Sequence, residues 1–79
     1  NLGTHTGSAR IAHLHQNLPG VLARVNHVLG EENINITAQS LATEGELGYV
    51  VTDVATLPSN ATLDALAHLE GTIRMRIVE

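Results

Sequence analysis

The stretch HQNLPGVL, residues 15–22, lies where a strand-like run ends and a helical pattern begins. It joins a polar cluster to a proline, whose φ angle is fixed, and to a glycine, whose backbone is flexible. Because proline favours the first helical position, we expect a helix to start at Leu18 or Pro19, with Asn17 as its N-cap. Apolar residues then recur at helical spacing, at Val21, Leu22, Val25, Val28 and Leu29. The stretch therefore predicts a strand followed by an amphipathic helix.

Further strands and a second helix follow from the rest of the chain. Alternation and turn signals predict strands over residues 8–15, 34–43, 48–57 and 72–78, and a second helix over 61–70. The segment 44–47 is short and contains glycine, so it should form the turn of an antiparallel hairpin. We expect Asn33 to adopt a left-handed conformation after the first helix.

The order of these elements, βαββαβ, decides the fold class. Two right-handed crossovers around a central hairpin are typical of the α+β, ferredoxin-like, two-layer sandwich. This fold has a four-stranded antiparallel sheet with both helices on one face. The other face is bare, and a bare face or an exposed edge strand offers a place for a partner subunit.

Alternation divides the side chains of the first strand between two faces. The two sets are Arg10, Ala12 and Leu14, and Ile11, His13 and His15. We expect the face with Ala12 and Leu14 to pack against the helices. In the second helix, the residues expected to face inward are Leu63, Leu66, Ala67 and Leu69.

Length and composition bound the class of protein. A chain of 79 residues makes one small domain, which buries only about 60% of the surface that its unfolded form exposes. With one Tyr and no Phe or Trp, the core must come from Val, Ile, Leu and Ala. The absence of cysteine excludes disulfides and thiolate metal sites and is compatible with the cytoplasm. A net charge of −4 and the lack of a long apolar run argue against nucleic-acid partners and membranes.

Residues 1–7, NLGTHTG, are polar and contain glycine, as expected of a linker or hinge. The chain opens with Asn1 and its only methionine is Met75, so we expect it to be an excised piece of a longer protein. Residues 8–79 then form the single folded domain.

Catalytic motifs are lacking. The chain has no cysteine nucleophile, no GxSxG or HExxH motif and no phosphate-cradling glycine loop. Asp53 and Asp64 stand alone in their segments, and we expect both to be solvated or capping residues. The sequence therefore does not predict an enzyme.

Two histidines supply the main alternative, a metal site. His13 and His15 are two apart on a strand and project to the same face, and His5 could join them from the linker. No Asp, Glu or Cys stands nearby in the sequence to complete such a site. A surface location is the better explanation of His5 and His13. RNA recognition needs several aromatic residues on the open face and is not favoured, because Tyr49 is the only one.

A polar set around the opening stretch suits a small zwitterion. It consists of His15, Asn17 and Asn35, the last on the second strand. An Asn side chain has two donors and an acceptor, so it can bind either charged group of an amino acid. Gly20, which has no Cβ, leaves N–H groups at the helix start accessible to a carboxylate. The residues alone leave an equal alternative, in which Asn17 only caps the helix and Asn35 only begins a strand.

Four segments together resemble a known family, and they occur in the same order: HQNLPGVLARVN, NINITAQSLAT, GYVVTDV and GTIRMRIVE. They resemble the ACT domain, a small βαββαβ module that senses amino acids and regulates metabolic enzymes. Within that family, the resemblance is to the C-terminal regulatory domains of bacterial D-3-phosphoglycerate dehydrogenases. It covers residues 7–79.

The resemblance implies an effector, L-serine, which is the product of the pathway and feedback-inhibits the dehydrogenase. It places serine at the interface of a homodimer, where the first strands and helices of two ACT domains pack side by side into one eight-stranded sheet. His15 and Asn17 would contact serine from one subunit, and Asn35 would reach it from the neighbour. Pro19 and Gly20 would supply the backbone of the effector loop.

The resemblance also assigns catalysis and NAD to a covalently attached region outside this chain, so that the domain itself needs no cofactor. Two departures stand out. The family's hinge has a glycine pair where this chain has Gly7 and Ser8. Family members can also have basic residues near the start of the first strand, where Ala9 precedes Arg10 in this chain. The remaining alternatives are an ACT domain for another amino acid, one that only assembles subunits, and a histidine-based metal domain.

Overall fold

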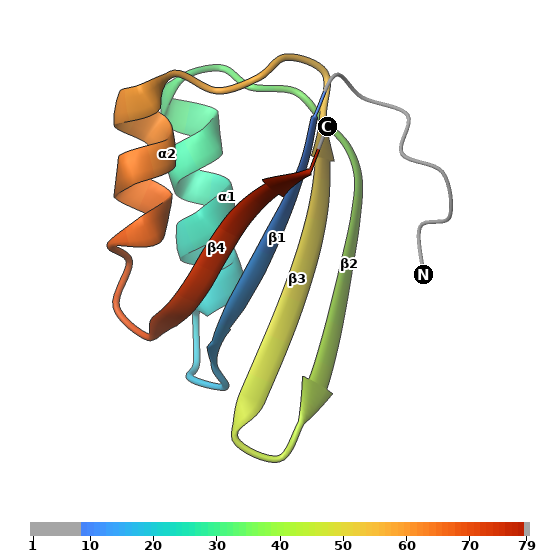
Figure 1. Ribbon diagram of the computed structural model, residues 1–79, viewed down its shortest axis with the longest axis vertical. Coiled ribbons are helices and arrows are strands. Elements are labelled where there is room, and N and C mark those ends of the chain that lie inside the picture. Colours follow the sequence, from blue (N-terminus) through green and yellow to red (C-terminus); the bar gives the residue numbers. More distant parts are fainter. Residues whose placement is uncertain (1–8, 79) are drawn as a thin grey trace.

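The computed structural model describes residues 9–78. Its elements are β1 (Ala9–Gln16), α1 (Val21–Glu31), β2 (Ile36–Glu44), β3 (Leu47–Val54), α2 (Asn60–Ala67) and β4 (Thr72–Val78). The strands form one sheet in the order β2-β3-β1-β4, and every neighbouring pair is antiparallel. Both helices lie on the same side of the sheet (Figure 1). The ferredoxin-like βαββαβ fold is confirmed, whereas the expectations for residues 1–7 lie outside the described residues.

The element boundaries agree with the expected ones to within a few residues. β4 spans the expected residues, and β2 and β3 form the expected hairpin with Gly45 and Glu46 as its turn. Gly45 has a φ of 59°, which a residue without a Cβ adopts readily. Asn33 also has a φ of 59°, so its left-handed conformation is confirmed.

β1 lies inside the sheet, between β3 and β4. Its backbone pairs with a neighbour on both sides, so it has no free edge for the sheet of a second molecule. The expectation that the first strands of two domains pack side by side is therefore wrong. Among the described strands, the two at the edges of the sheet are β2 and β4.

The first helix begins later than expected. α1 starts at Val21, and Gly20 occupies the N-cap position with a φ of 83°. No side chain of residues 9–78 caps this end, so the expectation of a helix starting at Leu18 or Pro19, with Asn17 as N-cap, is wrong. The left-handed Gly20 turns the chain just before the helix, and a residue with a Cβ would be strained there.

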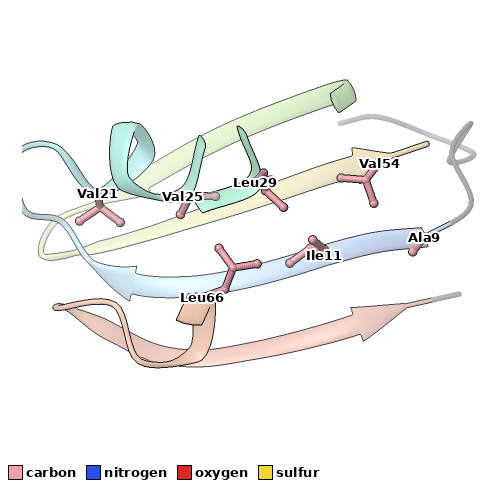
Figure 2. Close-up of a cluster of buried hydrophobic side chains, with 7 residues drawn as sticks. All are labelled: Ala9, Ile11, Val21, Val25, Leu29, Val54 and Leu66. Carbon is pink, nitrogen blue, oxygen red and sulfur yellow. The ribbon is translucent and has the colours of Figure 1, made fainter. Parts of the chain in front are cut away.

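The core lies between the helices and one face of the sheet (Figure 2). Its buried side chains are Ala9, Ile11, Val21, Val25, Leu29, Val54 and Leu66. Ile11 therefore faces the helices, whereas Ala12 and Leu14 line the open face beside Tyr49. The expectation that Ala12 and Leu14 meet the helices is wrong. Alternation sorts side chains into two sets but does not reveal which set the helices cover.

α2 is shorter than expected. Leu66 is fully buried, and Leu63 and Leu69 pack at the margin of the core, as expected. Ala67 is exposed, so its inward placement was wrong. The side chain of Ser59 caps the start of this helix. Within residues 9–78, neither helix is long and apolar enough to cross a membrane.

Asp53 lies in the interior with its side chain only 1% exposed. Its carboxylate accepts hydrogen bonds from Nε and Nη2 of Arg10, at 2.7 and 3.1 Å. The expectation of a solvated or capping Asp53 is therefore wrong. Asp64 is confirmed as a solvated residue, because its side chain is 75% exposed.

Candidate functional site

The loop between β1 and α1, residues 17–20, holds three of the predicted site residues. The backbone N–H of Asn17 donates to Glu46 O at 2.8 Å, and its side-chain Nδ2 donates to Gly45 O at 3.2 Å. These two bonds tie the loop to the β2–β3 turn. Between the loop and the turn is a pocket of about 250 Å³, lined by Gln16, Asn17, Leu18, Gly45 and Glu46.

The side chain of Asn17 is exposed, and the turn sets its direction. Because Nδ2 points at Gly45 O, the amide oxygen Oδ1 points away from the turn. No other residue among those described donates a hydrogen bond to this oxygen. Oδ1 can therefore accept one from an ammonium or hydroxyl group of a ligand.

His15 lies at the end of β1 and is 3% exposed. Its Nδ1 is 2.7 Å from Gln16 O. Since a carbonyl oxygen only accepts, Nδ1 must carry the proton, and the neutral ring then has a lone pair at Nε2. Nε2 is buried and has no hydrogen-bond partner among residues 9–78. Because such an atom costs about 1–3 kcal/mol, a donor that reached it would bind favourably.

Gly48 of β3 supports the His15 ring from one side. The two residues pair across the sheet. A Cβ at Gly48 would come within 2.8 Å of Nε2 and 3.0 Å of Nδ1 of His15, and its nearest contact would be with the ring carbon Cε1. Packed atoms do not approach so closely, so only glycine admits the ring in this orientation.

His13 neighbours His15 on the same face of β1, with ring centroids 5.4 Å apart and ring planes tilted by 33°. It is 1% exposed, so the expectation of a surface histidine is wrong. Its Nε2 lies 2.8 Å from Thr72 Oγ1 of β4. Burial lowers the pKa of His13, and a positive charge on His15 would lower it further. His13 is therefore neutral at pH 7.

Asn35 lies far from the loop within one chain. It precedes β2 at the end of the sheet where β1 begins, because Ile36 and Ala9 both pair with Val54. Asn17 follows the other end of β1, roughly 23 Å away at the usual rise of a strand. A single chain therefore brings together the loop and His15 but not Asn35.

Pro19 and Gly20 are exposed before the start of α1. A Cβ at Gly20 would meet nothing within 4 Å, so this glycine serves the turn and not a close contact. Within the described part of the chain, the first N–H groups of α1 have no side-chain cap. Such a helix start favours an anionic group.

Two further hollows, which the sequence did not predict, lie on the open face of the sheet. One of about 420 Å³ is lined by Leu14, Ala42, Thr43, Glu44, Leu47, Gly48 and Tyr49. The other, of about 240 Å³, brings Arg74 and Arg76 of β4 beside Tyr49. Alternation places the two arginines on one face, but the hollows depend on which small residues lie across from each other, and this register is not visible in the sequence.

The fold does not bring together a cluster of metal ligands among residues 9–78, as the alternative of a metal site would need. Within residues 9–78, no three His, Cys, Asp or Glu side chains gather where they could hold a metal ion. His13 and His15 each keep one buried ring nitrogen without a partner. The third expected ligand, His5, lies outside the described residues.

Sequence comparison relates the chain to one regulatory family and to one enzyme. The family described as the AHAS small subunit-like ACT domain matches residues 11–74. D-3-phosphoglycerate dehydrogenase of Haemophilus influenzae is 42% identical over 78 residues, which are 99% of this chain and 19% of that protein. The enzyme of Escherichia coli K12 is 40% identical over 74 residues, which are 91% of this chain and 18% of that protein. The chain thus spans about a fifth of the length of these relatives.

Solved structures share the fold at much lower identity. The ACT domain from GTP pyrophosphokinase of Chlorobium tepidum has a TM-score of 0.71 and 15% identity, covering 89% of this chain and 95% of that chain. The regulatory subunit of aspartate kinase from Thermus thermophilus has a TM-score of 0.72 and 18% identity, covering 90% and 50%. These likenesses show the fold alone. The family match and the identity to the dehydrogenases establish that the chain belongs to the ACT-domain family and is homologous to part of D-3-phosphoglycerate dehydrogenase.

Proposed function

We propose that this chain is a regulatory domain that binds L-serine between two copies of itself and confers feedback inhibition on a D-3-phosphoglycerate dehydrogenase. The observation that carries the proposal is the buried lone pair at Nε2 of His15, which has no partner among the residues that the structure describes. Identities of 42% and 40% to these dehydrogenases support the choice of parent enzyme. Catalysis and NAD would belong to a covalently attached region outside this chain, acting in the cytoplasm.

Serine offers a group to each polar element that a single chain brings together. Its hydroxyl can donate to Nε2 of His15, and its ammonium can donate to Oδ1 of Asn17. Its carboxylate can accept from the N–H groups at the start of α1. Glycine and alanine lack the hydroxyl and would leave Nε2 without a donor. Because Nε2 is out of contact with solvent, the site must open to admit the ligand.

The size of serine limits its affinity. With about seven non-hydrogen atoms and a ceiling of about −1.5 kcal/mol per atom, its binding free energy cannot pass roughly −10 kcal/mol. A micromolar sensor needs roughly −8 kcal/mol. Nearly every polar atom of serine must therefore be matched, which a site closed by two chains does better than an exposed loop.

Pairing of two β2 edges would bring Asn35 of one copy to the loop of the other. In an antiparallel, two-fold pair, the end of each β2 lies beside the start of its partner. The end of β2 leads into Gly45, which holds Asn17, whereas Asn35 precedes the start of β2. Asn17 and Asn35 from different copies would therefore converge at both ends of the paired strands. This arrangement gives two equal sites.

The β4 edge suits this role less well. It carries Arg74 and Arg76 on one face, so antiparallel pairing of two β4 strands would gather like charges. β2, with the sequence ITAQSLATE, has none of the Lys or Pro residues that protect edge strands from pairing. Pairing through β4 would also leave Asn35 on the opposite edge of the sheet.

Two substitutions test the shared site. Asn17→Ala and Asn35→Ala should each weaken serine binding about tenfold to a hundredfold, because each removes a partner that the site closed by two copies would bury, worth about 1–3 kcal/mol. In a mixed dimer of the two variants, one site has both defects and the other is intact. Calorimetry on the mixture should therefore recover one tight serine site per mixed dimer.

Asn60→Ala, at an exposed asparagine of α2, is the matched control and should bind serine normally. Unchanged serine affinity in both site variants would refute the assignment. Failure to recover binding on mixing would mean that Asn35 does not act from the second copy. Melting experiments with glycine and with zinc separate the alternatives, since a shift with zinc alone would favour a metal domain built on His13 and His15.

A further inference from the structure

We propose that His13, Thr72 and Gly48 hold the His15 ring in the orientation and tautomer that accept a hydrogen bond from the effector. His13 and Thr72 are then positioning residues that touch no ligand. The part of this inference that concerns effector affinity rests on the proposed function. The part that concerns the His15 ring rests on the fold alone.

A chain of hydrogen bonds determines the state of His13. The hydroxyl of Thr72 donates to Leu66 O at 3.3 Å, at the end of α2. A hydroxyl has one proton, so Thr72 Oγ1 must accept at its 2.8 Å contact with His13 Nε2. His13 is therefore the Nε2–H tautomer, and the chain runs from the α2 backbone through β4 to β1.

The His15 ring has neighbours on both sides. The ring of His13 lies 5.4 Å away between centroids, and the His15 ring packs so close to Gly48 that no space is left between them for a Cβ. The Nδ1–H group of His15 is held by Gln16 O at 2.7 Å. A ring turned by 180° would lose this bond. The Nε2 lone pair is thus presented in one direction, as a site needs when its ligand is small.

Loss of the Thr72 hydroxyl should change how the His15 ring is held. Without Oγ1, the Nε2–H group of His13 loses its 2.8 Å partner and keeps only its interaction with Leu66 O, so the ring is held less firmly. The His13 ring, which neighbours the His15 ring, then shifts, although Thr72 itself is on another strand. Serine binding weakens because His15 must be reordered when the ligand arrives.

The test compares Thr72→Val, which has the shape of threonine without the hydroxyl, with Thr72→Ser, which keeps it. Calorimetry should show serine binding about tenfold weaker in Thr72→Val and close to normal in Thr72→Ser. Long-range ¹H–¹⁵N spectra should show His15 as the Nδ1–H tautomer in the parent chain and in Thr72→Ser. In Thr72→Val the His15 ring resonances should report a mixture of tautomers.

Serine affinity in Thr72→Val within about twofold of the parent, with an unchanged tautomer, would overturn the inference. An Nε2–H tautomer of His15 in the parent chain would overturn it whether or not serine binds. If the parent chain does not bind serine, the proposed function fails, and the ring spectra still decide the inference. If Thr72→Val does not fold, His13→Gln serves as the second variant. It keeps a hydrogen-bond donor for Thr72 but removes the ring next to His15, so weakened serine binding is again expected.

Discussion

Burial of His13 makes the stability of the fold depend on pH. The pKa of His13 is lowered from its ordinary value of 6.5, first by burial and then by the charge that His15 can carry. Near and below that value, the unfolded chain binds a proton at this position more readily than the folded chain. The contribution of neutral His13 is therefore complete above about pH 6.5 and is lost as the pH falls toward the lower pKa of the folded state.

We predict that the free energy of unfolding, measured by urea titration, falls as the pH is lowered from about 7.5 to about 5.5. One proton gives a slope of at most about 1.4 kcal/mol per pH unit. His13→Gln removes the titrating ring and should flatten this slope. His27→Gln, at an exposed position of α1, is the control and should keep it. Equal slopes in His13→Gln and the parent chain would contradict the prediction.

The residues of the candidate site were easier to name from the sequence than their contacts. Asn17 was expected to cap a helix, but its amide reaches Gly45, 28 residues further on. Asp53 was expected in solvent, but Arg10 neutralises it from 43 residues away. Such partners depend on how strands align in the sheet, and no local pattern shows that alignment.

At the scale of elements, the sequence predicted the boundaries that glycine marks. Gly71 precedes β4, and Gly45 lies in the turn of the hairpin, and both elements formed as expected. The start of α1 was missed because the usual preference of proline for the first helical turn gave way to the left-handed Gly20. The covered face of β1 was missed because alternation has no direction.

The β2 edge should carry the association of two copies. Ser40 is the central residue of β2, so in a two-fold antiparallel pair it would lie near its own counterpart. We predict that Ser40→Lys weakens the dimer, because two like charges would face each other across the paired strands. Sedimentation at several protein concentrations would show the shift toward monomer, and serine binding should weaken with it.

A substitution on the other edge of the sheet provides the comparison. Ile73 lies on β4 and is 51% exposed, so Ile73→Lys adds the same charge to a strand that the proposed dimer leaves free. It should leave the dimer intact. Dissociation by Ile73→Lys with no effect of Ser40→Lys would place the interface at β4 and remove Asn35 from the shared site.

For the whole molecule, a second copy would also increase the small surface area that one short chain can bury. A chain of 79 residues buries only about 60% of its unfolded surface, so surface buried between two copies would add to a modest core. Serine bound across the interface would favour the paired state by the difference in its affinity for the two states. That difference is what an attached enzyme could sense.

We predict that L-serine inhibits the longer dehydrogenase that would contain this chain, and that Asn17→Ala raises the half-inhibitory serine concentration about tenfold or more. The measurement is the initial rate of the dehydrogenase over a series of serine concentrations. His27→Gln should retain the serine response. Serine that binds the domain without changing turnover would refute the regulatory half of the proposed function and leave the binding half intact.

The bond between Asn17 and the β2–β3 turn has a consequence for entropy. A free asparagine side chain on a loop would lose its rotational freedom when a ligand arrives, at a cost of about 0.5–1.5 kcal/mol. Here the carbonyl of Gly45 already restrains the amide, so that freedom is lost when the chain folds. A ligand as small as an amino acid would bind more tightly as a result, because the amide oxygen of Asn17 is already oriented before it arrives.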